Sequence, residues 1–323
     1  MTSGELDSRT PAGPESRGRS TFASGLGFAV SSYLLWGILP GYFVLLDPTG
    51  PIEIVAWRIV LSLAFCLILI AIVRGWRRFG PILRDRRAMA WLLLAGCLVT
   101  INWTVFVFAV LTGHVVEGAL GYFINPIVTV LLGVLLRERL NAIQWTAVGI
   151  SGVAVVVLAI GYGSFPWIAV VLALSFGFYG LVKNRVGGRV DAMSGLAIET
   201  GFVTPIAIGA LCWLGATTGV TFGSHGVWHT VLLFSAGAVT AVPLLLFAAG
   251  VRRLPLSVVG FAQYLAPILQ LITGIVLLGE PMPPARWIGF AIVWVALILL
   301  TVDMVRRSVV FRRTSRSGDV TRP

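Results

Sequence analysis

The chain has 323 residues, of which 57% are hydrophobic and only 11% are charged, and its mean hydropathy is +0.94. This composition is far more apolar than that of a water-soluble domain, so it excludes an ordinary soluble fold. The apolar segments are long and continuous and lack the alternation of a barrel strand. The sequence therefore predicts an all-α integral membrane protein.

Ten segments are long and apolar enough to be predicted as transmembrane helices. They cover residues 25–46, 52–73, 88–111, 115–136, 141–160, 164–183, 194–214, 228–250, 257–278 and 285–305. Residues 1–21 are polar and rich in proline, glycine and serine, which favours a disordered tail over a signal peptide. Residues 306–323 form a second tail, which is basic.

The formal net charge of +11 follows the predicted topology. If the N-terminus is cytoplasmic, 22 of the 24 basic residues fall in the tails and loops of the cytoplasmic side. The two exceptions are Arg58, inside a span, and Arg286, on the outside. This asymmetry obeys the positive-inside rule and predicts that both termini are cytoplasmic. Topology and anionic lipid headgroups explain the charge better than nucleic-acid binding does.

Cysteines and histidines give little sign of a metal site. Three cysteines lie inside predicted spans without the spacing of metal ligands, and inert thiols are expected: Cys66, Cys97 and Cys212. The three histidines are predicted on the outer side: His114, three residues before Glu117, and His225 and His229, four residues apart. Interfacial or loop histidines are favoured over zinc ligands. No metal and no cofactor are predicted.

An internal repeat relates the two halves of the chain. The segment "LGYFINPIVTVLLGVLL" from Leu120 aligns with "FAQYLAPILQLITGIVL" from Phe261 at an offset of 141 residues, and "SYLLWG" from Ser32 aligns with "SFGFYG" from Ser175. The predicted repeats, 22–160 and 161–305, hold five helices each. Because five is odd, the second repeat should enter the membrane upside down, which defines an inverted-topology repeat.

Three stretches resemble a known family: "NWTVFVFAV" from Asn102, "EGALGYFINPIVTVLLGVLLRERLNAIQW" from Glu117 and "GFAQYLAPILQLITGIVLLGEPM" from Gly260. They are similar to the RarD-type permeases of the EamA group in the drug/metabolite transporter superfamily, over about residues 22–305. The resemblance implies a ten-helix bacterial inner-membrane carrier, linked by name with chloramphenicol sensitivity. It favours export of a small organic metabolite or drug, and uptake stays open.

Two prolines interrupt the repeated helices near the predicted middle of the bilayer. Pro126 frees the carbonyl of Tyr122, and Pro267 frees that of Gln263, because proline has no N–H. Freed carbonyls beside polar side chains predict a site for a polar solute, a proton or water between the repeats. Packing of kinked helices is the alternative. The candidate substrate-binding residues are Tyr33, Trp36, Asn102, Tyr122, Asn125, Pro126, Thr129, Tyr179, Gln263, Tyr264, Pro267 and Gln270.

Aromatic residues on the first helix of each repeat belong to this set. Tyr33 and Trp36 in the first repeat correspond to Phe176 and Tyr179 in the second. They could line an apolar pocket for a flat substrate. Helix packing around the neighbouring glycines is slightly favoured instead.

Charged residues inside spans are costly and therefore point to function. Arg58 and Glu199 occupy matching repeat positions, but inversion places them near opposite faces. The predicted pairs are therefore Arg58 with Glu117, as an outer gate, and Lys183 with Glu199, as an inner gate; structural ion pairs and snorkelling are equally weighted alternatives. Two further carboxylates, Glu138 and Glu280, are predicted to be helix caps or interfacial groups.

The leading functional hypothesis is a secondary transporter, not an enzyme. The chain has no G-x-x-x-x-G-K motif, and its single lysine is Lys183, so an ion gradient or substrate flow would supply the energy. The predicted partners are a small-molecule substrate and the lipid bilayer. Proton coupling through Glu117 or Glu199 and a homodimer stay open. The alternatives are a membrane enzyme acting on a lipid or polyprenyl substrate and a receptor or assembly subunit without transport.

Overall fold

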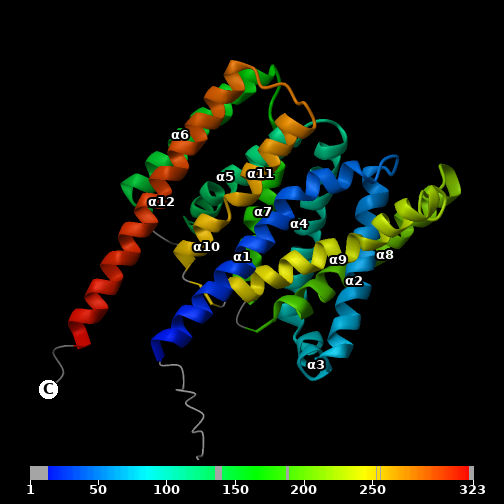
Figure 1. Ribbon diagram of the computed structural model, residues 1–323, viewed down its shortest axis with the longest axis horizontal. Coiled ribbons are helices and arrows are strands. Elements are labelled where there is room, and N and C mark those ends of the chain that lie inside the picture. Colours follow the sequence, from blue (N-terminus) through cyan, green and yellow to red (C-terminus); the bar gives the residue numbers. More distant parts are fainter. Residues whose placement is uncertain (1–13, 135–139, 187–188, 252, 255, 320–323) are drawn as a thin grey trace, which may run out of the picture.

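The computed structural model describes residues 14–134, 140–186, 189–251, 253–254 and 256–319, and these residues form helices and loops without a strand. Nine of the described helices are long and apolar enough to cross a membrane (Figure 1). They are α1 (Pro14–Val44), α2 (Pro51–Ile72), α4 (Arg86–Leu111), α5 (Val115–Gly133), α6 (Ala142–Tyr162), α7 (Trp167–Val186), α8 (Ala192–Thr217), α9 (Gly226–Val251) and α12 (Pro284–Asp319).

The remaining predicted span, 257–278, is not one continuous helix. It consists of α10 (Leu256–Ala262), a turn at Gln263 and Tyr264, α11 (Leu265–Ile272) and a π-helical turn, η2 (Thr273–Leu277). Pro267 is the third residue of α11 and cannot donate to the carbonyl of Gln263, so the break precedes it directly. The matching Pro126 lies inside a continuous α5. Nine long spans and one broken segment therefore replace the ten uniform helices expected.

The sequence prediction missed one short helix, α3 (Trp76–Arg84), in the arginine-rich segment after α2. Ile82 is buried in a small core with Leu92 of α4, Val186 of α7 and Ile198 of α8, while Phe79 packs against it. The helix also carries three arginines. α3 is therefore an amphipathic helix at the end of the bundle.

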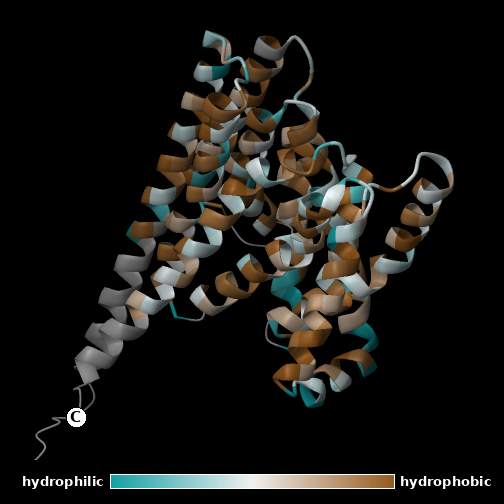
Figure 2. Cartoon of the chain, turned by 45° about the vertical axis from the view of Figure 1, so that its right-hand side comes forward, coloured by the Kyte–Doolittle hydropathy of each residue, from teal (hydrophilic) through white to brown (hydrophobic). Residues whose placement is uncertain are grey.

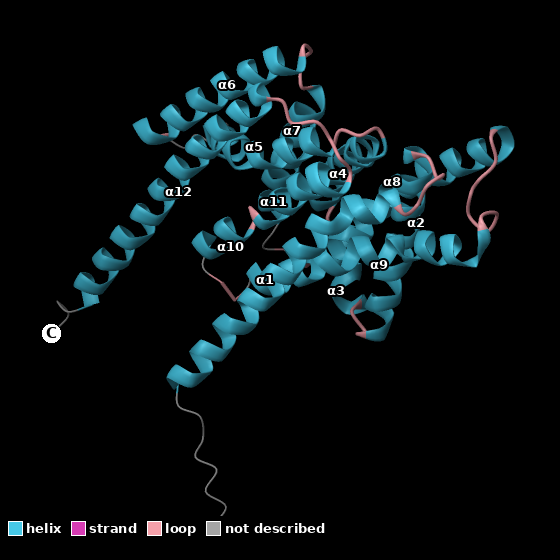
Figure 3. Ribbon diagram, turned by 45° about the horizontal axis from the view of Figure 1, so that its top comes forward, coloured by secondary structure: helices cyan, strands magenta, loops and turns pink. Residues whose placement is uncertain are grey.

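Two pairs of helices, each with one helix from either half of the chain, pack antiparallel to each other. α6 and α12 run antiparallel, because Asn141, at the start of α6, donates from Nδ2 to Asp303 Oδ1 at 2.6 Å, while Leu158 near its end contacts Gly289. α1 and α9 also run antiparallel. Between them, the Ser32 hydroxyl donates to the carbonyl of Pro243 at 2.9 Å. Figures 1 and 3 show these pairs side by side.

Two glycines, 141 residues apart, permit close approaches to the backbone of a neighbouring helix. A Cβ atom on Gly96 of α4 would lie 2.6 Å from the carbonyl oxygen of Glu199 on α8. A Cβ atom on Gly237 of α9 would lie 2.5 Å from that of Leu61 on α2. Any larger residue at these positions would meet the neighbouring backbone.

Hydrophobic residues occur along helices throughout the bundle (Figure 2), on its outer surface as well as in its interior. The larger core cluster joins α1, α2, α4, α7, α8 and α9, and a second joins α5, α6 and α12. Large apolar residues remain exposed around the bundle, such as Ile160 at 77%, Ile206 at 74% and Trp228 at 72%. So broad an apolar exterior fits a lipid environment rather than water.

Candidate functional site

The described chain has two chemically different ends. We call the end with α3 and the loop between α7 and α8 the arginine-rich end, where Asp85 and Arg189 lie 3.8 Å apart. The opposite end, with the starts of α2, α5 and α9, is the histidine end. There His229 Nε2 lies 2.9 Å from Thr49 Oγ1 and 3.2 Å from the carbonyl oxygen of Leu46.

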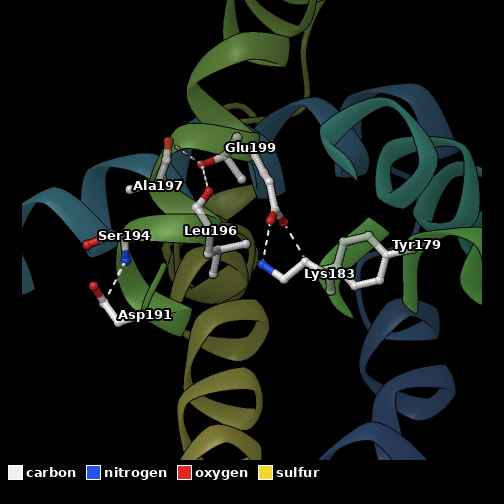
Figure 4. A network of polar contacts seen from close by, with 8 residues as sticks. Tyr179, Lys183, Asp191, Ser194, Leu196, Ala197 and Glu199 are labelled. Carbon is white, nitrogen blue, oxygen red and sulfur yellow. Dashed lines mark hydrogen bonds and ion pairs between the residues drawn. The ribbon is translucent and has the colours of Figure 1, made fainter. Parts of the chain in front are cut away.

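Near the arginine-rich end, Glu199 is fully buried and paired (Figure 4). Lys183 Nζ lies 2.6 Å from Glu199 Oε1, and the Tyr179 hydroxyl donates to Oε2 at 3.1 Å. Tyr179 and Lys183 are one turn apart on α7, and Glu199 lies about 10 Å along α8 from its start. The Lys183 side chain keeps 30% of its surface exposed. The predicted Lys183–Glu199 ion pair is confirmed; its role as a gate stays a prediction.

The predicted pair between Arg58 and Glu117 is wrong. Arg58 is 3% exposed, its Nε donates to Thr240 Oγ1 at 3.0 Å, and its guanidinium carbon lies 5.0 Å from the ring centre of Phe43 and 4.7 Å from that of Trp103. Side chains of α1, α4 and α9 thus enclose a cation from α2. Its Nη1 is buried without a hydrogen-bond partner.

Glu117 instead binds the start of a neighbouring helix. Its Oε1 accepts hydrogen bonds from the backbone N–H groups of Ile168 at 2.9 Å and Ala169 at 3.4 Å. The first N–H groups of a helix have no partner within the helix and carry a partial positive charge. A carboxylate at the start of α7 satisfies both requirements and holds α5 against α7.

Two further buried carboxylates at the histidine end bind backbone groups in the same way. Glu280 accepts from the N–H groups of Val115 and Val116 at the start of α5. Glu53 accepts from the N–H and the hydroxyl of Thr221 at 2.8 and 3.0 Å. The prediction of Glu280 as a helix cap is confirmed, although it caps a helix far away in sequence. Glu138 lies outside the described residues.

A polar network joins three of the candidate helices in the bundle interior. The Tyr122 hydroxyl donates to Asn102 Oδ1 at 2.9 Å, and Asn102 Nδ2 donates to Ser175 Oγ at 3.0 Å and to the carbonyl of Leu172 at 3.2 Å. Tyr122 also lies near Arg58. Asn102 and Tyr122 are therefore brought together with Arg58, which sequence spacing alone did not indicate.

The aromatic candidates of α1 pack against α9. Tyr33 and Trp36 lie 5.5 Å apart, and Phe247 lies 5.9 and 5.7 Å from them, measured between ring centres. Tyr33 is buried, and Gln270 Nε2 donates to the carbonyl of Trp36 at 3.2 Å. These contacts support the packing alternative, whereas a substrate role for the aromatic residues stays a prediction.

The residues around the two prolines divide into distinct environments. Asn125 Oδ1 and Gln270 Oε1 are buried without a hydrogen-bond partner. Thr129 is exposed, and its hydroxyl donates to the carbonyl of Asn125 in its own helix. Gln263 and Tyr264 form the break before Pro267. The candidate binding residues around the two prolines thus lie in different environments, and their role in binding stays a prediction.

A wide apolar groove lies on the outside of the bundle. It measures about 1030 Å³ and is lined by α5, α10, α11, η2 and α12, with Phe123, Ile268, Trp287 and Trp294 on its walls. Tyr264 is the candidate binding residue that reaches it. Its lining is almost entirely apolar, so lipid chains fit this groove better than a polar solute does.

Possible metal ligands do not cluster in the described part of the chain, where no group of three or more His, Cys, Asp or Glu side chains could hold an ion. The His225 and His229 rings lie 5.6 Å apart. His229 uses Nε2 for the contacts with Thr49 and Leu46, so this ring is part of the packing of the histidine end.

Nine long apolar helices with ionised groups inside the bundle define a multi-pass membrane protein. The EamA-like transporter family matches residues 23–160 and again residues 165–302. This chain therefore belongs to the EamA-like transporter family and is a membrane transporter, which confirms the resemblance to RarD-type permeases.

Individual relatives match nearly the whole chain. Protein RarD of Streptomyces exfoliatus is 45% identical over 284 residues, covering 88% of this chain and 90% of that protein. The uncharacterized transporter YojE of Bacillus subtilis (strain 168) is 40% identical over 297 residues, covering 91% and 97%. A solved crystal structure with 16% identity has a TM-score of 0.56 and covers 87% of this chain and 98% of that chain, which shows a shared fold.

Proposed function

We propose that the protein is a secondary transporter that exports a small organic metabolite or drug across the bacterial inner membrane, with both termini in the cytoplasm. Transport would proceed by alternating access about a midplane site between two inverted repeats, 22–160 and 161–305. The observation that carries this proposal is a pair of buried amide oxygens without protein partners, Asn125 Oδ1 on α5 and Gln270 Oε1 on α11. Buried polar atoms normally have a hydrogen-bond partner, so a solute or water is the missing donor.

Matched contacts in the two halves support the inverted repeat. Ser32 of α1 binds the backbone of α9, and the corresponding Ser175 of α7 binds Asn102 of α4. Gly96 and Gly237 make equivalent close approaches to α8 and α2. The pairing of α1 with α9 is thus repeated by α7 with α4, and that of α4 with α8 by α9 with α2. This repetition supports a pseudo-two-fold axis between the halves.

The ion pair near the arginine-rich end supplies a gate in this scheme. Opening that end requires α7 and α8 to separate, which would break the contact between Lys183 and Glu199. A proton on Glu199 would neutralise its charge and weaken the pair, so proton coupling through Glu199 is part of the proposal. At the histidine end, Glu117 and Glu280 would have to release backbone N–H groups instead.

Extracellular metabolites and chloramphenicol tolerance in strains that lack or overexpress the protein test the transport proposal. We expect at least one small organic solute to accumulate outside the overexpressing cells and to fall outside the deletion cells. A protonophore should reduce this difference if protons drive export. Identical solute profiles in all strains and conditions would contradict the transporter proposal.

Leucine in place of the two residues with unpartnered amide oxygens tests the midplane site. We expect Asn125→Leu and Gln270→Leu each to lower the transport rate about tenfold, the effect of losing one hydrogen bond to the solute. The measurement is export of the solute identified in cells, at equal membrane abundance of each variant. Thr146→Val is the control, because this exposed hydroxyl donates to the carbonyl of Ala142 in its own helix. Full transport in both leucine variants would place the site elsewhere.

A further inference from the structure

Arg58 is a buried cation, and no residue in the described part of the chain forms an ion pair with it. Its guanidinium touches the rings of Phe43 and Trp103 and donates from Nε to Thr240, and its exposed fraction is 3%. These residues, which we call the arginine cage, come from α1, α2, α4 and α9. The cage lies about 10 Å along α2 from the histidine end.

The buried carboxylates with described contacts are occupied elsewhere. Glu117 binds the start of α7, and Glu280 binds the start of α5. Glu53 binds the loop at Thr221, and Glu199 binds Lys183. Among the described ion pairs none includes Arg58.

An uncompensated guanidinium is expensive in this environment. Arginine does not lose its proton in proteins, so Arg58 cannot escape the cost of burial by becoming neutral. The aromatic rings and one hydroxyl stabilise the cation only partly, and its Nη1 remains without an acceptor. A bound anion would complete the hydrogen bonds and neutralise the charge.

We propose that Arg58 binds the carboxylate of the transported solute, an organic monoanion with an apolar body. This inference rests on the proposed transport function and adds the substrate class. A guanidinium binds a carboxylate through two parallel hydrogen bonds, and the surrounding rings provide apolar contacts for the rest of the molecule.

A monocarboxylate suits the cage better than a phosphate monoester does. Arg58 supplies one positive charge, and the described contacts of the cage include no second cation. A dianion would therefore carry an uncompensated negative charge into the apolar interior. An inside-negative membrane potential also favours outward movement of a monoanion, which agrees with export.

Three probes of nearly identical shape test the charge preference: benzoate, benzamide and benzamidine. The dissociation constant of each for the detergent-purified full chain is measured at neutral pH from the shift in thermal unfolding with probe concentration. We expect benzoate to bind about tenfold to a hundredfold more tightly than benzamide, and benzamidine to bind most weakly. Equal dissociation constants of the wild-type protein for benzoate and benzamide would overturn the inference.

Variants assign the preference to Arg58. Arg58→Gln should bind benzoate and benzamide equally, whereas Arg253→Gln should keep the wild-type preference. Arg253 is the matched control because it also lies over a ring, 5.1 Å from the centre of Phe28, but it is exposed. A benzoate preference retained in Arg58→Gln overturns the inference. If this variant does not fold, Arg58→Lys decides: about tenfold weaker benzoate binding is expected, and unchanged binding overturns the inference.

The solute found in cells separates this inference from the transport proposal. Export of a neutral or cationic solute alone would overturn the carboxylate site and leave the transport proposal standing. Arginine-dependent benzoate binding with no solute exported would support the anion site and contradict the transport proposal.

Discussion

Replacing Lys183 by methionine is expected to destabilise the folded protein by about 3 kcal/mol. The change removes the cation that lies 2.6 Å from the fully buried carboxylate of Glu199. The hydroxyl of Tyr179 is then the described side-chain partner that Glu199 keeps. Because the Lys183 side chain is 30% exposed, the expected loss is at the lower end of the range for broken buried pairs. Denaturant titration in mild detergent measures the free energy of unfolding.

Two further variants separate the stability of this pair from its function. The double change Lys183→Met with Glu199→Leu should recover most of the lost stability, because no charge remains buried without a partner. If the pair is a gate, transport should stay impaired in the stable double variant. Arg189→Gln serves as the control, since its contact with Asp85 at 3.8 Å is exposed and should contribute less than about 1 kcal/mol. A Lys183→Met protein as stable as this control would contradict the prediction.

The membrane class and most spans could be predicted because length and hydropathy decide them locally. The break at Gln263 and Tyr264 could not, although Pro267 was recognised. Pro126 stays within a continuous helix while Pro267 follows a break, so the same residue type permits both outcomes. After the two prolines the chain also differs, because α5 continues to Gly133 whereas α11 ends at Ile272 and a π-helical turn follows.

Of the two ion pairs predicted from the sequence, one forms in the structure and the other does not. Lys183 and Glu199 could be paired from the sequence because the predicted topology places both near the cytoplasmic side. Arg58 and Glu117 were paired by the same logic, but Glu117 binds backbone N–H groups at the start of α7. Every residue except proline has a backbone N–H, so the sequence does not mark which N–H groups bind a carboxylate. Side-chain charges alone therefore could not predict that Glu117 binds the start of α7 instead of Arg58.

Gly96→Ala and Gly237→Ala are each expected to destabilise the protein by about 1–3 kcal/mol. The new methyl group would lie 2.6 Å from the carbonyl oxygen of Glu199 in the first variant and 2.5 Å from that of Leu61 in the second. Both obstacles are backbone atoms of a neighbouring helix, so a side-chain rotation cannot relieve the overlap. The helices would have to move apart, and the contacts of α4 with α8 and of α9 with α2 would weaken.

Gly152→Ala is the control for the loss of glycine itself. Gly152 lies inside α6, and a Cβ atom there would meet nothing within 4 Å. Alanine should therefore be neutral or stabilise this helix by up to about 1 kcal/mol. Unfolding in mild detergent and the transport rate are measured for all three variants. Because Gly96 and Gly237 occupy matching positions in the two halves, similar losses are expected for both. A harmless Gly96→Ala beside a damaging Gly237→Ala would contradict equivalent close contacts and weaken the case for an inverted repeat.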